Sequence, residues 1–210
     1  MKRKIRFFIG ILCAVLMLSA CGKQVTEKKN DTQEETKSSF LGDAVVEEDG
    51  ELSEIGTAED GWEEARDKAW SEATSDGKKA PSDRFDRGKA EEIVKLVNEE
   101  RARKGLGALV IDEAMMTAAE TRAQEQKTLF SHTRPDGSQC FTVFAQYEIP
   151  ANYRGENLAS GTICPSSIVM DMWIASEGHY ANIINERFTR IGVGYFESGN
   201  YGYWAQLFAN

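Results

Sequence analysis

The stretch GHYANIINERFTRIGVG, residues 178–194, contains the change of pattern that decides the fold class. The segment before it, residues 164–178, places its apolar residues at helical spacing, so we expect a helix there. From Arg190 the period becomes two, and residues 190–197 and 201–208 each alternate apolar with other side chains around a turn-like ESGN. Such a pattern is typical of two antiparallel strands. The sequence therefore predicts a C-terminal β-hairpin that follows a helix.

Further upstream, the same reading predicts more helices. Residues 86–105 and 111–130 both carry an apolar face at helical spacing, with Gly105 as the expected end of the first and Asp112 as the N-cap of the second. Residues 138–149 form a shorter apolar segment, which we expect to be helical as well. Helices first and paired strands last predict an α+β domain.

The N-terminus has the pattern of an export signal. A basic start is followed by a charge-free apolar run, residues 7–20, which is too short to span a bilayer and suits a signal peptide. The run ends in LSAC, which resembles the bacterial lipobox. The resemblance implies a signal peptide over residues 1–20, lipid attachment at Cys21 and a location on the outer face of a bacterial cell membrane, held there by the N-terminal lipid. An ordinary signal peptide is the alternative.

Charge divides the remainder of the chain. Residues 22–80 contain 8 basic and 17 acidic residues and few apolar ones, so we expect residues 21–82 to be an acidic, mostly disordered tether. A short helix over residues 58–73 is left open, and residues 83–210 are expected to form one globular domain. The chain carries a net charge of −9 and no basic cluster, which argues against nucleic acid as a partner.

Two cysteines fall inside the expected domain, Cys140 and Cys164. An even pair in an exported protein suggests a disulfide. Two separate buried thiols are the alternative, and the sequence leaves both open.

Five segments together resemble one family. LVNEERARKGLGAL, FSHTRPDGS, GENLA, GHYANIINERFTRIGVG and YWAQLF occur in the order and approximate spacing of the CAP superfamily, which groups cysteine-rich secretory proteins, antigen 5, plant pathogenesis-related proteins and short bacterial members. The resemblance covers about residues 86 to 210. It implies an α-β-α sandwich, with a small, mainly antiparallel sheet between helical layers and an open cleft on one side.

The resemblance also implies a site. Two histidines and two acids line the family's cleft, and His132, Glu156 and His179 match three of them. The fourth position, counted from the preceding tryptophan, falls on Ser176, with Glu177 one residue later. Glu177 would diverge from His179 in a helix and face the same way in an extended segment, so the sequence leaves both outcomes open.

The chemistry of these residues allows three functions. His132, His179 and Glu156 suit a divalent metal, with zinc the ion to expect, although the HExxH spacing of zinc proteases is missing. We rank binding of a metal or small ligand first, a structural polar cluster second and a cell-envelope hydrolase third, because no nucleophile falls in a recognisable motif. The ligand itself, whether a small molecule, a lipid or a cell-envelope component, is not indicated. We expect Asn157 to form a turn beside Glu156. Architectural roles are expected for the residues that match the family's strand-entry motif: Asn182, Phe188, Ile191, Gly192 and Gly194.

Overall fold

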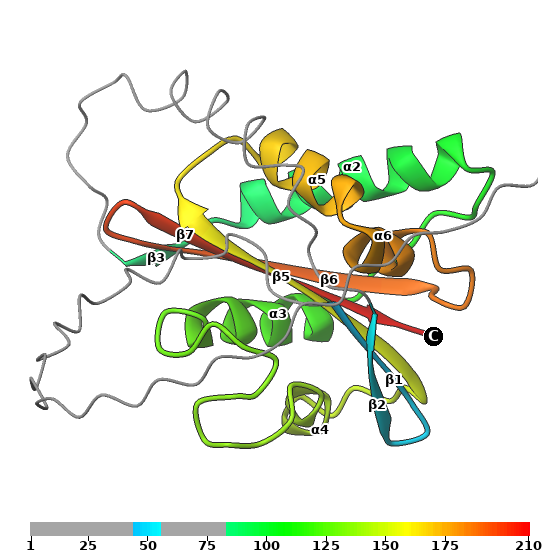
Figure 1. Ribbon diagram of the computed structural model, residues 1–210, viewed down its shortest axis with the longest axis horizontal. Helices are drawn as coiled ribbons and strands as arrows, with labels where there is room; N and C mark the ends of the chain where they lie inside the picture. Colours follow the sequence, from blue (N-terminus) through cyan, green and yellow to red (C-terminus); the bar gives the residue numbers. More distant parts are fainter. Residues whose placement is uncertain (1–43, 56–82) are drawn as a thin grey trace, which may run out of the picture. The chain divides into compact units, whose positions relative to one another are not determined.

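The computed structural model describes residues 44–55 and 83–210, and they form one sheet with helices on both of its faces (Figure 1). The predicted signal peptide, the predicted lipid-attachment residue Cys21 and the predicted helix over residues 58–73 lie outside the described residues. Within the described part of the chain, no helix has the length and apolar character to cross a membrane.

The sheet has the strand order β2-β1-β5-β7-β6-β3, with the short strand β4 also paired to β6. Every pairing is antiparallel except the parallel pair β4–β6. The predicted C-terminal hairpin is confirmed as β6 and β7. The strands are β1 (Ala44–Glu48), β2 (Glu51–Ile55), β3 (Arg84–Phe85), β4 (Val110–Ile111), β5 (Tyr153–Thr162), β6 (Arg190–Ser198) and β7 (Tyr201–Ala209).

The helices form two layers. One face of the sheet carries α2, α5 and α6, and the other carries α3 and α4 (Figure 1). The expected α-β-α sandwich is therefore confirmed, and the expected helix over residues 164–178 is divided at Ser176 into two. The helices are α2 (Arg87–Arg103), α3 (Glu113–Glu125), α4 (Thr142–Gln146), α5 (Ser166–Ala175) and α6 (Glu177–Ile183).

The ends of the two longest helices follow from local chemistry. The carboxylate of Asp112 accepts hydrogen bonds from the backbone N–H groups of Ala114 and Met115, as predicted for an N-cap. The helix α2 ends two residues before Gly105, whose φ of 76° belongs to the left-handed region that glycine adopts without strain.

Two glycines of β6 let α3 lie against the sheet. A Cβ atom at Gly192 would overlap the backbone of Met115, and one at Gly194 would overlap the backbone of Ala119. No larger residue fits at either position without moving the helix. Both glycines therefore have the architectural role expected of them.

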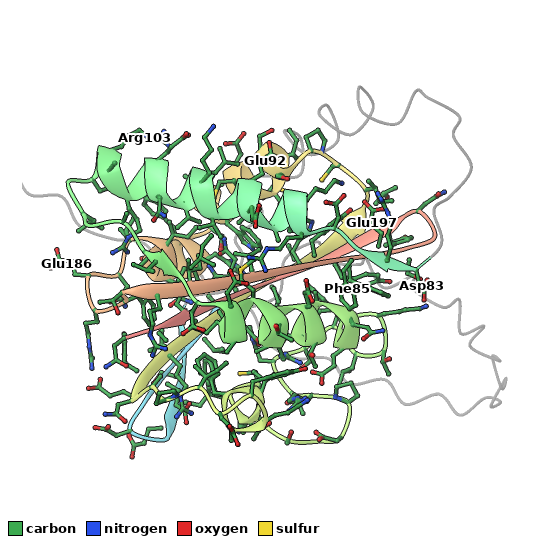
Figure 2. All side chains as sticks on the ribbon, turned by 180° about the vertical axis from the view of Figure 1, so that it is seen from behind. Asp83, Phe85, Glu92, Arg103, Glu186 and Glu197 are labelled. Atoms are coloured by element: carbon green, nitrogen blue, oxygen red, sulfur yellow. The ribbon has the colours of Figure 1, made fainter. Side chains whose placement is uncertain are left out.

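The end of the sheet at β3 is held by charged and aromatic contacts. Figure 2 shows Phe85 and Glu197 close together there. The buried carboxylate of Glu197 accepts hydrogen bonds from Arg84 (2.7 Å), Lys89 (3.3 Å) and the hydroxyl of Tyr195 (2.9 Å). Because each of these donors satisfies the buried charge, the cluster fastens the start of α2 to the sheet.

The expectation of a mostly disordered tether needs correction for residues 44–55. These residues form the hairpin of β1 and β2, and β1 pairs with β5 inside the sheet. The average composition of residues 22–80 hid a short apolar run, AVV at residues 44–46, which is buried. The domain therefore includes chain from both sides of residues 56–82.

A second correction concerns GENLA. These residues belong to the long strand β5, so the prediction that Asn157 forms a turn was wrong. Asn157 is fully buried and satisfies its amide with neighbouring polar groups, which is why a polar residue is stable in the middle of this sheet.

The structure decides between the two alternatives left open for the cysteines. Cys140 and Cys164 are both free and buried. Cys140 belongs to the apolar cluster on the face of α3 and α4, and Cys164 to the larger cluster on the face of α2 and α5. The sheet separates the two thiols, so the alternative of two buried thiols describes the structure.

Candidate functional site

The candidate site is built around Glu156 on β5. Its carboxylate lies 2.6 Å from Nδ1 of His132, and neither the carboxylate nor the guanidinium of Arg122 is exposed to solvent. Arg122 donates from Nε and Nη2 to the two carboxylate oxygens, over 2.7 Å and 3.0 Å. The side chain of His132 is 14% exposed, which makes it the most accessible of the three.

The charge of Glu156 is fixed by these partners. Burial raises the pKa of a carboxyl group, but the charge of Arg122 and the hydrogen bonds from His132 and Arg122 outweigh burial and lower the pKa of Glu156 to about 2. An ionised carboxylate only accepts hydrogen bonds, so Nδ1 of His132 carries the proton of this bond. In this tautomer of neutral His132 the lone pair is on Nε2, so a metal that Glu156 also binds can use Nδ1 only after the proton moves from Nδ1 to Nε2.

A second set of ion pairs holds Arg122 in place. Arg122 also donates to Glu125 (2.5 Å) and to the backbone oxygen of Ser131 (2.9 Å). Glu125 in turn accepts from Arg134 (2.7 Å), which lies in the loop after α3. These contacts tie the loop that carries His132 to α3, so the position of the imidazole depends on the whole network.

Cys140 completes a group of three donor side chains. One ligand atom each from His132, Cys140 and Glu156 lies within 4.8 Å of the others. Burial and the nearby charge of Glu156 raise the pKa of the Cys140 thiol, so the thiol is protonated at neutral pH. Among the described residues this is the one group of three that offers metal-binding atoms at such distances.

His179 lies elsewhere. Successive side chains of a strand point to opposite faces of a sheet, so Glu156 faces α3 while Asn157 faces α6. Asn157 donates to the backbone oxygen of His179 over 3.0 Å, and the ring of His179 is hydrogen-bonded to Ser176 at 2.7 Å. The structure therefore brings His132 and Glu156 together but leaves His179 on the other face of the sheet. The predicted metal ligand set of His132, His179 and Glu156 has to be revised.

The fourth predicted position is occupied by Ser176. Glu177 is exposed in the first turn of α6, and Ser176 is buried beside His179. Because residues two apart on a helix do not face each other, Glu177 and His179 diverge.

Sequence reasoning did not single out Arg122 as a member of the site, nor Cys140 as a neighbour of Glu156. Arg122 follows Ala119 by three residues, a spacing that places both on the buried face of a helix. A charged residue among the small apolar ones of that face was the available signal. Nothing in the sequence brings Cys140 close to Glu156, because the loop between α3 and α4 sets that distance.

The class of protein is defined by the fold, by the contact of the buried Glu156 with His132, and by the close packing of α3 on β6. Comparison of the sequence with known protein families identifies this class. Residues 94–208, more than half of the chain, match the CAP family, the cysteine-rich secretory protein family. The chain belongs to this family.

Individual relatives agree with this assignment. The chain is 40% identical over 118 residues to "Uncharacterized protein YkwD" of Bacillus subtilis, a match that covers 55% of this chain and 45% of that protein. An extracellular protein containing an SCP domain from Bacillus anthracis is similar in structure, with a TM-score of 0.53 at 22% identity, over 77% of this chain and 47% of that one. An outer surface protein from Borrelia burgdorferi gives a TM-score of 0.54 at 23% identity, over 60% of this chain and 97% of that one. The chain thus spans less than half the length of the two Bacillus proteins.

Proposed function

We propose that this chain is an extracytoplasmic CAP-domain protein, anchored through lipid on Cys21, that binds a divalent transition-metal ion at the group of His132, Cys140 and Glu156. The export signal and the lipobox-like LSAC support the anchor and the compartment. The observation that supports metal binding is the closeness of three side chains of the types that zinc prefers. Zinc is the first ion to test.

The donor set fits zinc in its chemistry. Imidazole, thiolate and carboxylate are all common zinc ligands, and three protein ligands leave a fourth position for water or another ligand. A zinc ion held in this way lowers the pKa of its bound water and polarises a bound carbonyl group. His132, Cys140 and Glu156 would hold the ion, and Arg122 would orient the carboxylate.

The same contacts also limit the affinity. Arg122 already donates to both oxygens of Glu156, so a bound cation has to share the carboxylate with a buried positive charge. Cys140 has to lose its proton before it can bind a metal. We therefore expect binding to weaken as the pH falls, because protons compete with the metal for its ligand atoms.

A hydrolytic function has weaker support. Cys140 is a buried, protonated thiol, whereas a nucleophilic cysteine has to be an accessible thiolate. The hydrogen bond of Ser176 to His179 is of the kind that activates a serine, but both side chains are buried and a substrate cannot reach them in this conformation. A purely structural cluster remains the alternative, and the experiment below distinguishes it from metal binding.

Zinc calorimetry on the mature chain carrying Cys21→Ser tests the proposal. We expect one ion per chain at pH 7, no binding after His132→Ala or Cys140→Ala, and weaker binding after Glu156→Gln, because that change removes charge and keeps shape. Arg122→Gln should bind zinc more tightly than the wild type, since it removes the competing cation. Circular dichroism confirms that each variant is folded.

Two variants serve as matched controls. Glu177→Ala removes an exposed carboxylate, and His179→Ala removes the histidine on the other face of the sheet, so both should bind zinc like the wild type. A folded wild-type chain that gives no heat with zinc, or a His132→Ala variant that binds as well as the wild type, would leave the structural cluster as the better account.

A further inference from the structure

The hairpin of β1 and β2 occupies a sheet edge that is otherwise open. In the described part of the chain, β5 pairs with β7 on one side and with β1 on the other. The pairing aligns Val45 with Glu156 and Glu48 with Tyr153. Without the hairpin, this part of β5 would present unpaired backbone groups, and such an edge is a template for another strand.

The valine side chains of β1 alternate between two apolar clusters on opposite faces of the sheet. Val45 is 1% exposed and packs with Cys140 and Phe144 in the cluster on the α3 face. Val46 is 7% exposed and belongs to the cluster on the opposite face, with Tyr153. Each valine therefore packs into a separate cluster on its own side of the sheet edge, as expected for an extended strand.

Two arginines bind the acidic residues that follow. Arg154 donates to Glu47 over 2.9 Å. Arg187 donates from both terminal nitrogens to the two oxygens of Glu48, each over 2.7 Å. A bidentate arginine contact of this kind recognises a carboxylate by shape as well as charge. The edge therefore matches two apolar residues followed by two acidic ones.

The backbone of β1 is recognised as well. The buried amide of Asn182 donates to the backbone oxygen of Val45 over 3.2 Å and to the side-chain oxygen of Asn157 over 2.9 Å. A side chain fixed in this way reads the main chain of the strand whatever its sequence. Main-chain bonds that give affinity, with alternate pockets that give specificity, are the features of peptide recognition by strand addition.

We propose that the β5 edge between Arg154 and Glu156 is a binding site for an extended peptide with two apolar residues followed by two acidic residues, and that residues 44–48 are its occupant in cis. The hairpin makes no covalent link to the edge, and a two-stranded hairpin has little stability of its own, so it can exchange. Residues 56–82 connect it to the rest of the domain. None of these contacts is made through an ion, so peptide binding is measured without added metal.

Peptide binding to the mature chain with Cys21→Ser tests the proposal. The probe is a fluorescein-labelled peptide of residues 42–50, GDAVVEEDG, and the readout is fluorescence anisotropy. The wild-type chain should bind it weakly, because its own strand competes at an effective concentration of the order of millimolar. A chain with Val45→Asp and Val46→Asp should bind the probe at least 10-fold more tightly, since its own strand no longer packs into the two apolar clusters.

Matched controls separate the edge from general effects. Val110→Asp makes the same change at a valine that is 67% exposed on β4, and it should bind the probe as the wild type does. A probe with both valines replaced by aspartate should bind none of the chains. Adding Arg187→Gln to the strand variant should lower its affinity for the probe about 2- to 5-fold, because the exposed ion pair to Glu48 is lost.

A folded strand variant that binds the probe no better than the wild type would overturn the proposal. If that variant does not fold, a protease site inserted between Gly61 and Trp62 gives a second measurement, because cleavage there separates the hairpin from residues 83–210. Exchange of the cleaved fragment for excess labelled peptide, with the domain still folded, supports the site. Retention of the fragment against a 100-fold excess of peptide, or unfolding on cleavage, contradicts it.

Discussion

Replacing Glu156 by glutamine tests the electrostatic basis of the site. The change keeps the shape of the side chain and removes a charge that is fully buried against Arg122. The pKa of Glu156 lies at about 2, against an ordinary value of 4.5, and this difference corresponds to about 3 kcal/mol of stability at neutral pH. Loss of one partner of a buried ion pair costs about 3–5 kcal/mol, because the other charge is left uncompensated. We therefore expect Glu156→Gln to lower the free energy of unfolding by about 3–5 kcal/mol at pH 7.

The sign of the pH dependence follows from the direction of the shift. Because the pKa of Glu156 is lower in the folded state than in the unfolded state, its contribution is fully present above pH 4.5 and is lost as the pH falls toward 2. The difference in unfolding free energy between wild type and variant should therefore be constant from pH 7 to pH 5 and shrink below that. Taking the difference removes the contribution of the other carboxylates.

Urea unfolding of both chains from pH 7 to pH 2.5 measures this difference. Glu177→Gln is the matched control, since it removes an exposed carboxylate, and it should change stability by less than about 0.5 kcal/mol. A Glu156→Gln variant within 1 kcal/mol of the wild type at pH 7, or a difference that stays constant down to pH 2.5, would refute the account of a buried, ionised carboxylate held by Arg122.

Three further predictions follow from the fold and the sequence. Gly194→Ala should destabilise the domain by about 1–3 kcal/mol or more in urea unfolding, because the new methyl group overlaps the backbone of Ala119; an unchanged midpoint would mean that α3 does not pack so closely. In the native host, Cys21→Ser should leave unprocessed precursor or released protein on membrane fractionation, and normal processing with retention in the membrane would exclude the lipoprotein. Thiol titration of the unfolded, unreduced chain carrying Cys21→Ser should find the thiols of Cys140 and Cys164 both reactive. If neither thiol reacts, the two cysteines form a disulfide.

The parts of the fold that were predictable are those set by local sequence. The helices α2 and α3 each carry apolar residues at helical spacing and a recognisable end, with Asp112 as one cap and Gly105 as one stop. The alternation along β6 and β7 identified the hairpin, because each strand has a face toward each helical layer.

The strands that were missed depend on distant partners. Strand β5 carries Glu156 and Asn157 side by side, and both are buried only because Arg122 and Asn182 satisfy them across the two faces. A run of buried polar residues has no strand signal in the sequence. The hairpin of residues 44–55 was not predicted for a related reason. Its three buried apolar residues form a short run within a segment that is otherwise acidic.

The candidate site was also predicted only in part. Motif resemblance identified His132 and Glu156 as residues of one site, and they are in contact. It did not show that His179 lies on the other face, because only the pairing of β5 within the sheet decides which of two adjacent residues faces α3. The approach of Cys140 to Glu156 likewise depends on a loop whose path the sequence does not specify.

X-ray absorption at the zinc edge tests most directly the claim that His132, Cys140 and Glu156 act as one metal site. The sample is the folded mature chain with Cys21→Ser, loaded with one equivalent of zinc at pH 7.5. We expect one sulfur ligand at about 2.3 Å and nitrogen or oxygen ligands at about 2.0–2.2 Å. The sulfur signal should disappear after Cys140→Ser. A spectrum of bound zinc without sulfur, or a spectrum that Cys140→Ser leaves unchanged, would contradict the claim.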